Sequence, residues 1–137
     1  MSLVDWMSKK QPTIEEYVFG ADFVVLKHVM EALRDICCNL RMMGVPLSCC
    51  SYVYGDSMSV IHNTQRPGLT LRNKLTSICY HAVREYMAMG YTNTAHISTH
   101  DNVSDLLTKV VYVAKRKKFV NGIFNGIYDF FCMVEST

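Results

Sequence analysis

The stretch from Val18 to Met43 constrains the fold most, because its apolar residues recur at steps of three and four positions. That spacing places them on one face of a long α-helix, and such a face has to pack against other elements. Gly44 follows the pattern and Pro46 stands just beyond it, which predicts the end of the helix. The apolar positions are Phe19, Phe23, Leu26, Met30, Leu33, Cys37 and Leu40.

Shorter patterns alternate around this helix. Residues 4–11, 51–56 and 91–98 are expected to be strands, because they are β-rich or alternate in polarity. Helices are expected at 57–64, at 70–89, from about 103, and at 115–130. The resulting order, β-α-β-α-α-β-α-α, favours an α/β domain in which helices flank a sheet. A chain of 137 residues is long enough for one such domain with a core of its own.

The helix at 70–89 carries a second apolar face, which should pack on the core. Gly90 follows it and predicts its end. The residues expected on that face are Leu71, Leu75, Ile78, Ala82 and Val83.

The composition of the chain bears on the compartment and the binding partners that we expect for the protein. A net charge of +2 does not by itself indicate a nucleic-acid-binding protein, although "KRKK" at 115–118 forms a local basic block. No apolar run approaches the length of a membrane span, and the N-terminus does not look like a signal peptide. The six cysteines show no CxxC spacing, so we expect free thiols. We therefore expect an intracellular protein, in the cytoplasm or nucleus, with no membrane partner.

Three carboxylates stand where elements of the predicted fold begin or end. Asp22 lies in the first turns of the long helix, Asp56 ends a strand expected to be central, and Asp105 starts a late helix. In α/β sheets, ligands collect at such positions, and carboxylate oxygens suit Mg²⁺. Each acid also has a simpler explanation, because acids favour helix starts and cap them.

Several stretches together resemble the ribonuclease H domain of copia-type LTR retrotransposon polyproteins. The resemblance covers about residues 4–129 and implies a ribonuclease H-like mixed sheet with flanking helices. In intact relatives it implies Mg²⁺-dependent hydrolysis of the RNA strand of RNA–DNA hybrids. The stretches are "SKKQPTIEEYVFGADFVVLK" (8–27), "LRMMGVP" (40–46), "YVYGDSMSVIHNT" (52–64), "LTSICYHAVRE" (75–85), "THDNVSDLLTK" (99–109) and "KFVNGIFNGIYDF" (118–130).

By this resemblance, Asp22, Asp56 and Asp105 correspond to metal-binding carboxylates, but the pattern is altered. Asp22 stands in place of the family's glutamate, and Ser57 replaces the asparagine that usually follows Asp56. The family's first β-hairpin and its metal-binding aspartate lie upstream of the matching stretch, so we expect this chain to lack them. Mg²⁺ binding is therefore expected to be weak or absent and to depend on Asp56 together with Asp105.

Three functions follow as alternatives. The first is a degenerate ribonuclease H-like domain without efficient catalysis, a pseudoenzyme that acts as a binding module for nucleic acid or protein. The second is an active Mg²⁺-dependent ribonuclease, and the third is a module for an unknown protein partner. His100 is a weak candidate for assisting catalysis, whereas His81 is either structural or a contact to nucleic acid. The residues expected to bind nucleic acid are Lys9, Lys10, Arg72, Lys74, Lys115, Arg116, Lys117 and Lys118.

The absent hairpin also leads us to expect a homodimer. Without it, one strand would expose unpaired backbone groups, and Trp6, Phe23 and Val53 would expose apolar surface. An exposed sheet edge pairs readily with another chain. We therefore expect two copies to associate through that edge.

Overall fold

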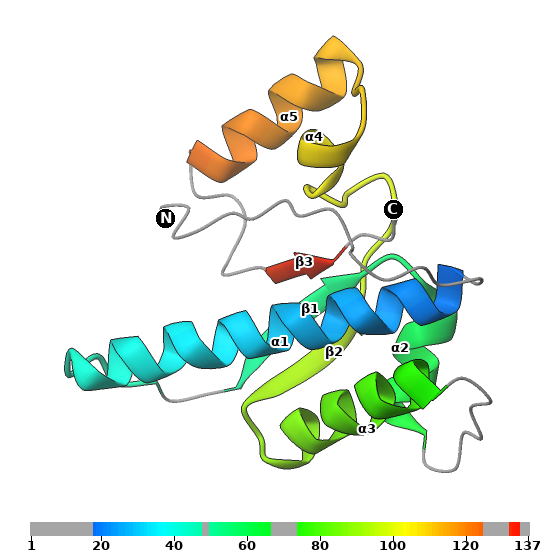
Figure 1. The fold of residues 1–137 in the computed structure, drawn as a ribbon. Helices are drawn as coiled ribbons and strands as arrows, with labels where there is room; N and C mark the ends of the chain where they lie inside the picture. The colour runs from blue at the N-terminus through cyan, green and yellow to red at the C-terminus, as the bar shows by residue number, and fades with distance from the viewer. Residues whose placement is uncertain (1–17, 48–49, 67–73, 125–131, 135–137) are drawn as a thin grey trace.

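The computed structural model describes residues 18–47, 50–66, 74–124 and 132–134 of the chain. The strand expected at 4–11 lies outside these ranges. Figure 1 shows the remaining elements. In chain order they are α1 (Val18–Met42), β1 (Ser51–Gly55), α2 (Met58–Gln65), α3 (Lys74–Ala88), β2 (Thr92–His96), α4 (Asp105–Thr108), α5 (Val113–Phe124) and β3 (Cys132–Val134).

The three described strands form one sheet with β1 at its centre. β1 pairs in parallel with β2, with Val53 opposite Thr94, and in parallel with β3, with Val53 opposite Cys132. The prediction that the strand ending at Asp56 is central is therefore confirmed. The sequence did not predict β3. Both pairings are parallel, so the described residues contain no antiparallel part of the mixed sheet that we expected.

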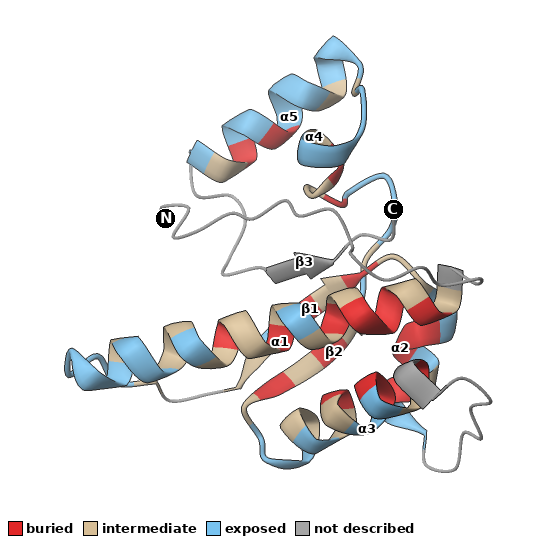
Figure 2. Ribbon diagram, in the orientation of Figure 1, coloured by how far each residue is buried: buried red, intermediate tan, exposed pale blue. Residues whose placement is uncertain are grey.

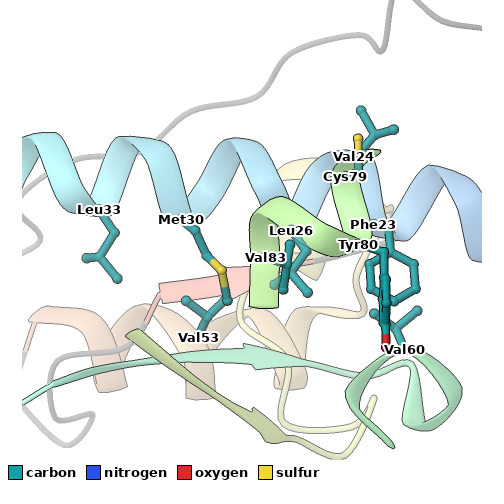
Figure 3. Close-up of a cluster of buried hydrophobic side chains, with 10 residues drawn as sticks. All are labelled: Phe23, Val24, Leu26, Met30, Leu33, Val53, Val60, Cys79, Tyr80 and Val83. Atoms are coloured by element: carbon teal, nitrogen blue, oxygen red, sulfur yellow. The ribbon is translucent and has the colours of Figure 1, made fainter. Parts of the chain in front are cut away.

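The core lies where α1 and α3 pack on each other, with α1 also against β1 and α3 against β2 (Figure 2). Phe23 is fully buried at its centre, with its ring edge-on to Phe19 at 5.0 Å and to Tyr80 at 5.7 Å between centroids. Figure 3 shows Phe23 and Tyr80 among the side chains of the buried cluster. The buried cluster consists of Phe23, Val24, Leu26, Met30, Leu33, Val53, Val60, Cys79, Tyr80 and Val83.

This packing corrects one expectation. Phe23 and Val53, which we expected to be exposed in the absence of a hairpin, both have no exposed surface. The reason is that helix α1 itself covers this part of β1, and α3 covers Phe23 in turn. Trp6, the third residue of that expectation, lies outside the described residues.

The face of α3 that meets the core also differs from the predicted one. Val83 is buried as expected, but Ile78 is 53% exposed. Thr76, Cys79 and Tyr80 are buried instead. Tyr80 fits there because its hydroxyl donates a hydrogen bond to the Arg66 carbonyl at 3.1 Å, which satisfies the polar end of a large apolar ring. The side chains of Leu71 and Leu75 lie outside the described residues.

Both long helices end at the predicted glycines. Gly44 adopts φ +79°, a left-handed conformation that glycine reaches without strain. Its N–H donates to the Arg41 carbonyl at 3.0 Å, and the Val45 N–H donates to the Leu40 carbonyl at 3.0 Å. These two bonds form a Schellman motif, which satisfies carbonyls that the helix leaves unpaired. Gly90 ends α3 similarly, with φ +73°.

The last helices form a separate part of the fold. In Figure 1, α4 and α5 lie together above β3, away from α1 and α3. The expected helix near 103 is a single turn, and α5 begins two residues earlier than predicted. The predicted end of α5 near residue 130 falls outside the described ranges. None of the helices in these ranges combines the length and apolar character that crossing a bilayer requires.

Candidate carboxylate site

Two of the three predicted carboxylates share a pocket at the end of the central strand. Asp56 directly follows β1, and Asp22 projects from α1, where it is almost fully buried. The pocket has a volume of about 20 Å³, which is room for about one water molecule. Its other lining residues are Leu26, Gly55, Ser57, Val60 and Ile61. Two acids therefore meet where a β strand ends, as the sequence indicated, but in a largely apolar setting.

The third carboxylate, Asp105, has a different environment. It is buried at the start of α4, and both of its oxygens accept hydrogen bonds from lysines. The Lys109 ammonium donates to Oδ1 at 3.1 Å, and the Lys115 ammonium donates to Oδ2 at 2.8 Å. Two positive charges thus face one buried negative charge, and this arrangement stabilises the ionised carboxylate.

Lys115 also connects α5 to the loop that precedes α4. Its ammonium donates to the Thr99 carbonyl at 3.2 Å and lies 5.1 Å from the centre of the Phe119 ring. Phe119 is fully buried, and Lys115 lies over its ring on the same side of α5. We call the contacts of Lys109 and Lys115 with Asp105, together with the Lys115–Thr99 bond, the lysine clamp.

A second ion pair reinforces the connection between α5 and this loop. The Lys118 ammonium donates to Asp101 Oδ1 at 2.8 Å. This hydrogen bond, followed by the charge of Lys118, lowers the pKa of the Asp101 carboxyl. The loop itself is ordered by Asn102, a fully buried residue whose Oδ1 accepts the Ser104 N–H at 3.1 Å. The polar loop 99–105 is therefore a structural connector to α5.

The described residues do not bring the three carboxylates into one cluster. Asp22 and Asp56 line the same pocket, whereas Asp105 is not among its lining residues. Across the described ranges, no group of three or more His, Cys, Asp and Glu side chains is placed to hold a metal ion. Asp56 thus shares its pocket with Asp22 and not with Asp105, whereas the expected metal-binding pair was Asp56 with Asp105.

The two histidine candidates lie at the surface. His100 is exposed in the loop between β2 and α4. His81 is exposed on α3, and its ring lies edge-on to Tyr80 with 5.2 Å between centroids. Neither lines the pocket of Asp22 and Asp56.

The basic block at 115–118 divides into two pairs. Lys115 and Lys118 bind acids of the neighbouring loop and helix, as described above. Arg116 and Lys117 are exposed. Lys9, Lys10 and Arg72 lie outside the described residues, as does the side chain of Lys74. Only part of the basic block at 115–118 is therefore a solvated helix face.

Sequence reasoning missed Lys109 and Lys115 as partners of Asp105. Lys109 could have been found, because it stands four residues after Asp105 and such pairs meet on a helix. Lys115 carries no comparable local signal, since it reaches Asp105 only after α5 has folded back. Cys37, Cys38, Cys50 and Cys79 are free thiols.

Comparison with known proteins places the chain near retroelement sequences. It is 29% identical over 106 residues to the retrovirus-related Pol polyprotein from transposon RE2 of Arabidopsis thaliana. It is 28% identical over 106 residues to the corresponding polyprotein from transposon RE1 of the same plant. Each match covers 77% of this chain but only 7% of the polyprotein. No protein-family model matches the chain, and no solved structure matches it significantly. The similarity fits a retrotransposon-derived domain.

Proposed function

We propose that this chain is a retrotransposon-derived ribonuclease H-like domain that keeps the fold, lacks efficient catalysis and acts as a binding module. The observation that carries the proposal is the lysine clamp on Asp105. By the resemblance to copia-type sequences, Asp105 corresponds to a metal ligand. In this chain its two oxygens are already bound by ammonium groups at 3.1 and 2.8 Å.

The clamp opposes metal binding for an electrostatic reason. A divalent cation at Asp105 would stand beside two ammonium groups, and like charges at that separation repel strongly in a partly buried site. Releasing the lysines would in turn cost the ion pairs that hold α5. Asp22 and Asp56 remain as two acids in one small pocket, and two carboxylates with water can hold one hard cation weakly. These residues do not suit a two-metal centre.

The binding role rests on the exposed cations of α5. Phosphate groups require only positive charge within reach, and Arg116 and Lys117 provide it on an open helix surface. The expected ligand is an RNA–DNA hybrid or another nucleic acid, bound weakly and without regard to sequence. Lys9, Lys10, Arg72 and Lys74 extend the proposed set. A contact with a protein is the alternative binding role.

The second candidate function is an active Mg²⁺-dependent ribonuclease. The shared pocket of Asp22 and Asp56 favours it, because two acids converge at the end of the central strand as they would in a working metal site. Asp22 and Asp56 would then hold the ion, and the ion would supply the charge that hydrolysis of a phosphodiester requires. Asp105 would have to exchange its lysines for that role.

A cleavage assay decides between the two functions. The purified chain is incubated with a fluorescently labelled RNA–DNA hybrid in Mg²⁺ and, separately, in Mn²⁺. We expect no cleavage above that of an Asp56→Asn variant. Cleavage that disappears in both the Asp56→Asn and the Asp105→Asn variants would establish the active enzyme. Cleavage that persists in both variants comes from a contaminating nuclease. The proteins are then purified further until the background cleavage no longer falls, and the wild type is compared with the variants again.

A further inference from the structure

Helices α3 and α5 each present an exposed row of side chains with the same spacing. On α3 the row is Ile78, Ala82, Glu85 and Met89, and on α5 it is Val113, Lys117, Val120 and Phe124; Ala82 is half-buried and the other seven are exposed. In both rows the steps are four, three and four residues, which keep the side chains on one side of a helix. Met89 belongs to the α3 row because its N–H donates to the Glu85 carbonyl at 2.9 Å, which continues the helical pattern.

Both rows are apolar surfaces that contain one charge. Ile78 is 53% exposed and Met89 55%, while Val113 is 59% and Phe124 76% exposed. Each row has a single ionisable member, Glu85 on α3 and Lys117 on α5, and the two charges are opposite. Within the part of the chain that the structure describes, neither of these two residues takes part in an ion pair. Among the described residues, each row therefore lacks both an apolar cover and a counter-ion.

We propose that α3 of one copy of this chain packs antiparallel against α5 of a second copy. In this register, Glu85 meets Lys117 of the second copy at the middle of the contact. Ala82 meets Val120 next to it, and the larger apolar side chains close the ends. The remaining pairs are Ile78 with Phe124 and Met89 with Val113.

The charges select this arrangement over the others. A parallel pairing of the same two rows would place Glu85 against Val120 and Lys117 against Ala82. Each charge would then lie against an apolar side chain, without a charged partner. An antiparallel pairing of α5 with α5 would bring the two Lys117 ammonium groups near each other. Pairing α3 with α3 would do the same with Glu85. Of these arrangements, only the antiparallel contact of α3 with α5 pairs the opposite charges with each other and the apolar side chains with each other.

The sheet edge offers less to a second copy than the sequence suggested. On β2, the Thr94 carbonyl accepts a hydrogen bond from the Gln65 side chain at 3.3 Å. The Thr94 N–H donates to the Asn93 side chain at 2.9 Å. On the other side of β1, β3 already pairs with residues 53–55. The exposed apolar residues of α3 and α5 offer a second copy another surface for self-association.

The size of the contact sets the expected strength. One pair of short helices is small beside the roughly 1,200–2,000 Å² of a stable interface, but a twofold arrangement would form the contact twice. If two copies cannot form both contacts with each other at once, the same contact links successive copies head to tail. In either case the mean molecular mass should rise with protein concentration, with a dissociation constant on the order of tens of micromolar.

Charge reversal with rescue tests the proposal. Mass is measured by sedimentation equilibrium, without nucleic acid, for wild type, Glu85→Lys, Lys117→Glu and the double variant Glu85→Lys/Lys117→Glu. We expect each single reversal to weaken association by about tenfold, because it places like charges at the centre of the contact. The double variant should recover most of the wild-type affinity. His62→Glu and His62→Lys, on the exposed surface of α2, are matched controls and should associate like wild type.

Two results would overturn the pairing. The first is a wild-type protein that stays monomeric up to about 200 µM, a concentration well above the expected association range. The second is a double variant no better than the single variants, which would place Glu85 and Lys117 in different contacts or in none. Because hybrid binding and cleavage are not involved in these measurements, failure of the proposed function leaves this test intact, and the reverse also holds.

Discussion

The ammonium of Lys115 lies 2.8 Å from Oδ2 of Asp105, whose side chain is only 5% exposed. Asp105 begins α4, and Lys115 stands in the first turn of α5, so this ion pair joins two helices across the segment between them. The same ammonium also binds the Thr99 carbonyl. One lysine therefore holds a helix, a loop and a buried acid together.

Removal of Lys115 should destabilise the protein more than removal of Lys109. Lys115→Met leaves the buried Asp105 with one ammonium and also frees the Thr99 carbonyl, so we expect a loss of about 1–3 kcal/mol in unfolding free energy. The Lys109 side chain is 50% exposed, against 29% for Lys115, and water screens its pairing more. Urea denaturation of the two variants measures both values. Equal losses would mean that Lys115 has no special role.

The salt dependence of nucleic-acid binding should depend on Arg116 and Lys117. Each cation that contacts a phosphate contributes about one unit to the slope of log K against log salt. Replacing both by alanine should lower the slope by about 2. Fluorescence anisotropy of a labelled hybrid at several NaCl concentrations gives the slope.

Lys115 and Lys118 provide the matched control for that experiment. Both bind acids of the same chain, so the Lys115→Ala/Lys118→Ala variant should change the slope less than the Arg116→Ala/Lys117→Ala variant, provided that it remains folded. If the two double variants change the slope equally, the division of the block into clamped and exposed cations is wrong.

Acid should weaken the contact between Asp101 and Lys118. The pKa of Asp101 is lowered in the folded protein, chiefly by its hydrogen bond to Lys118. A lowered folded pKa means that the stabilisation is present above the pKa of the unfolded chain and is lost as the pH falls through the folded value. Wild type and Asp101→Asn should thus differ in stability near neutral pH and converge below about pH 4. A difference that grows on acidification would contradict this sign.

Phe23 and Ile78 provide a direct test of the core. Phe23→Ala should cost about 3–5 kcal/mol, because it removes a fully buried ring from between Phe19 and Tyr80. Ile78→Ala, at a 53% exposed position, should change the stability of the monomer by about 0.5 kcal/mol or less. Denaturation at low protein concentration checks both. A large loss of stability for Ile78→Ala would mean that Ile78 belongs to the buried face of α3, as the sequence predicted.

These residues also show how far the sequence can predict the fold. The spacing of apolar residues correctly located α1, and Gly44 correctly marked its end, because both signals are local. The central position of the strand before Asp56 was likewise predictable from its short apolar run. The face of α3 was not, because the buried Tyr80 packs on Phe23 and its hydroxyl donates to the carbonyl of Arg66, and both partners lie far from it in the sequence.

The site shows the same division between local and distant signals. The sequence singled out Asp22, Asp56 and Asp105 by their places at the ends of elements. Asp22 and Asp56 come together as this reasoning suggests, since one ends a strand and the other lies on the helix that covers it. Asp105 does not join them in the pocket, because its partners include Lys115, ten positions later in the chain. Such a contact depends on how α5 folds back and has no periodic signature.

A calorimetric titration with Mg²⁺ tests the central claim most directly, namely that Asp105 belongs to the lysine clamp and not to a metal site. We predict at most one weak site, which Asp22→Asn and Asp56→Asn abolish and Asp105→Asn leaves in place, because the first two acids share the pocket. Circular dichroism confirms that each variant is folded. Two tight Mg²⁺ sites in the wild type, or binding that is lost in Asp105→Asn, would contradict the account.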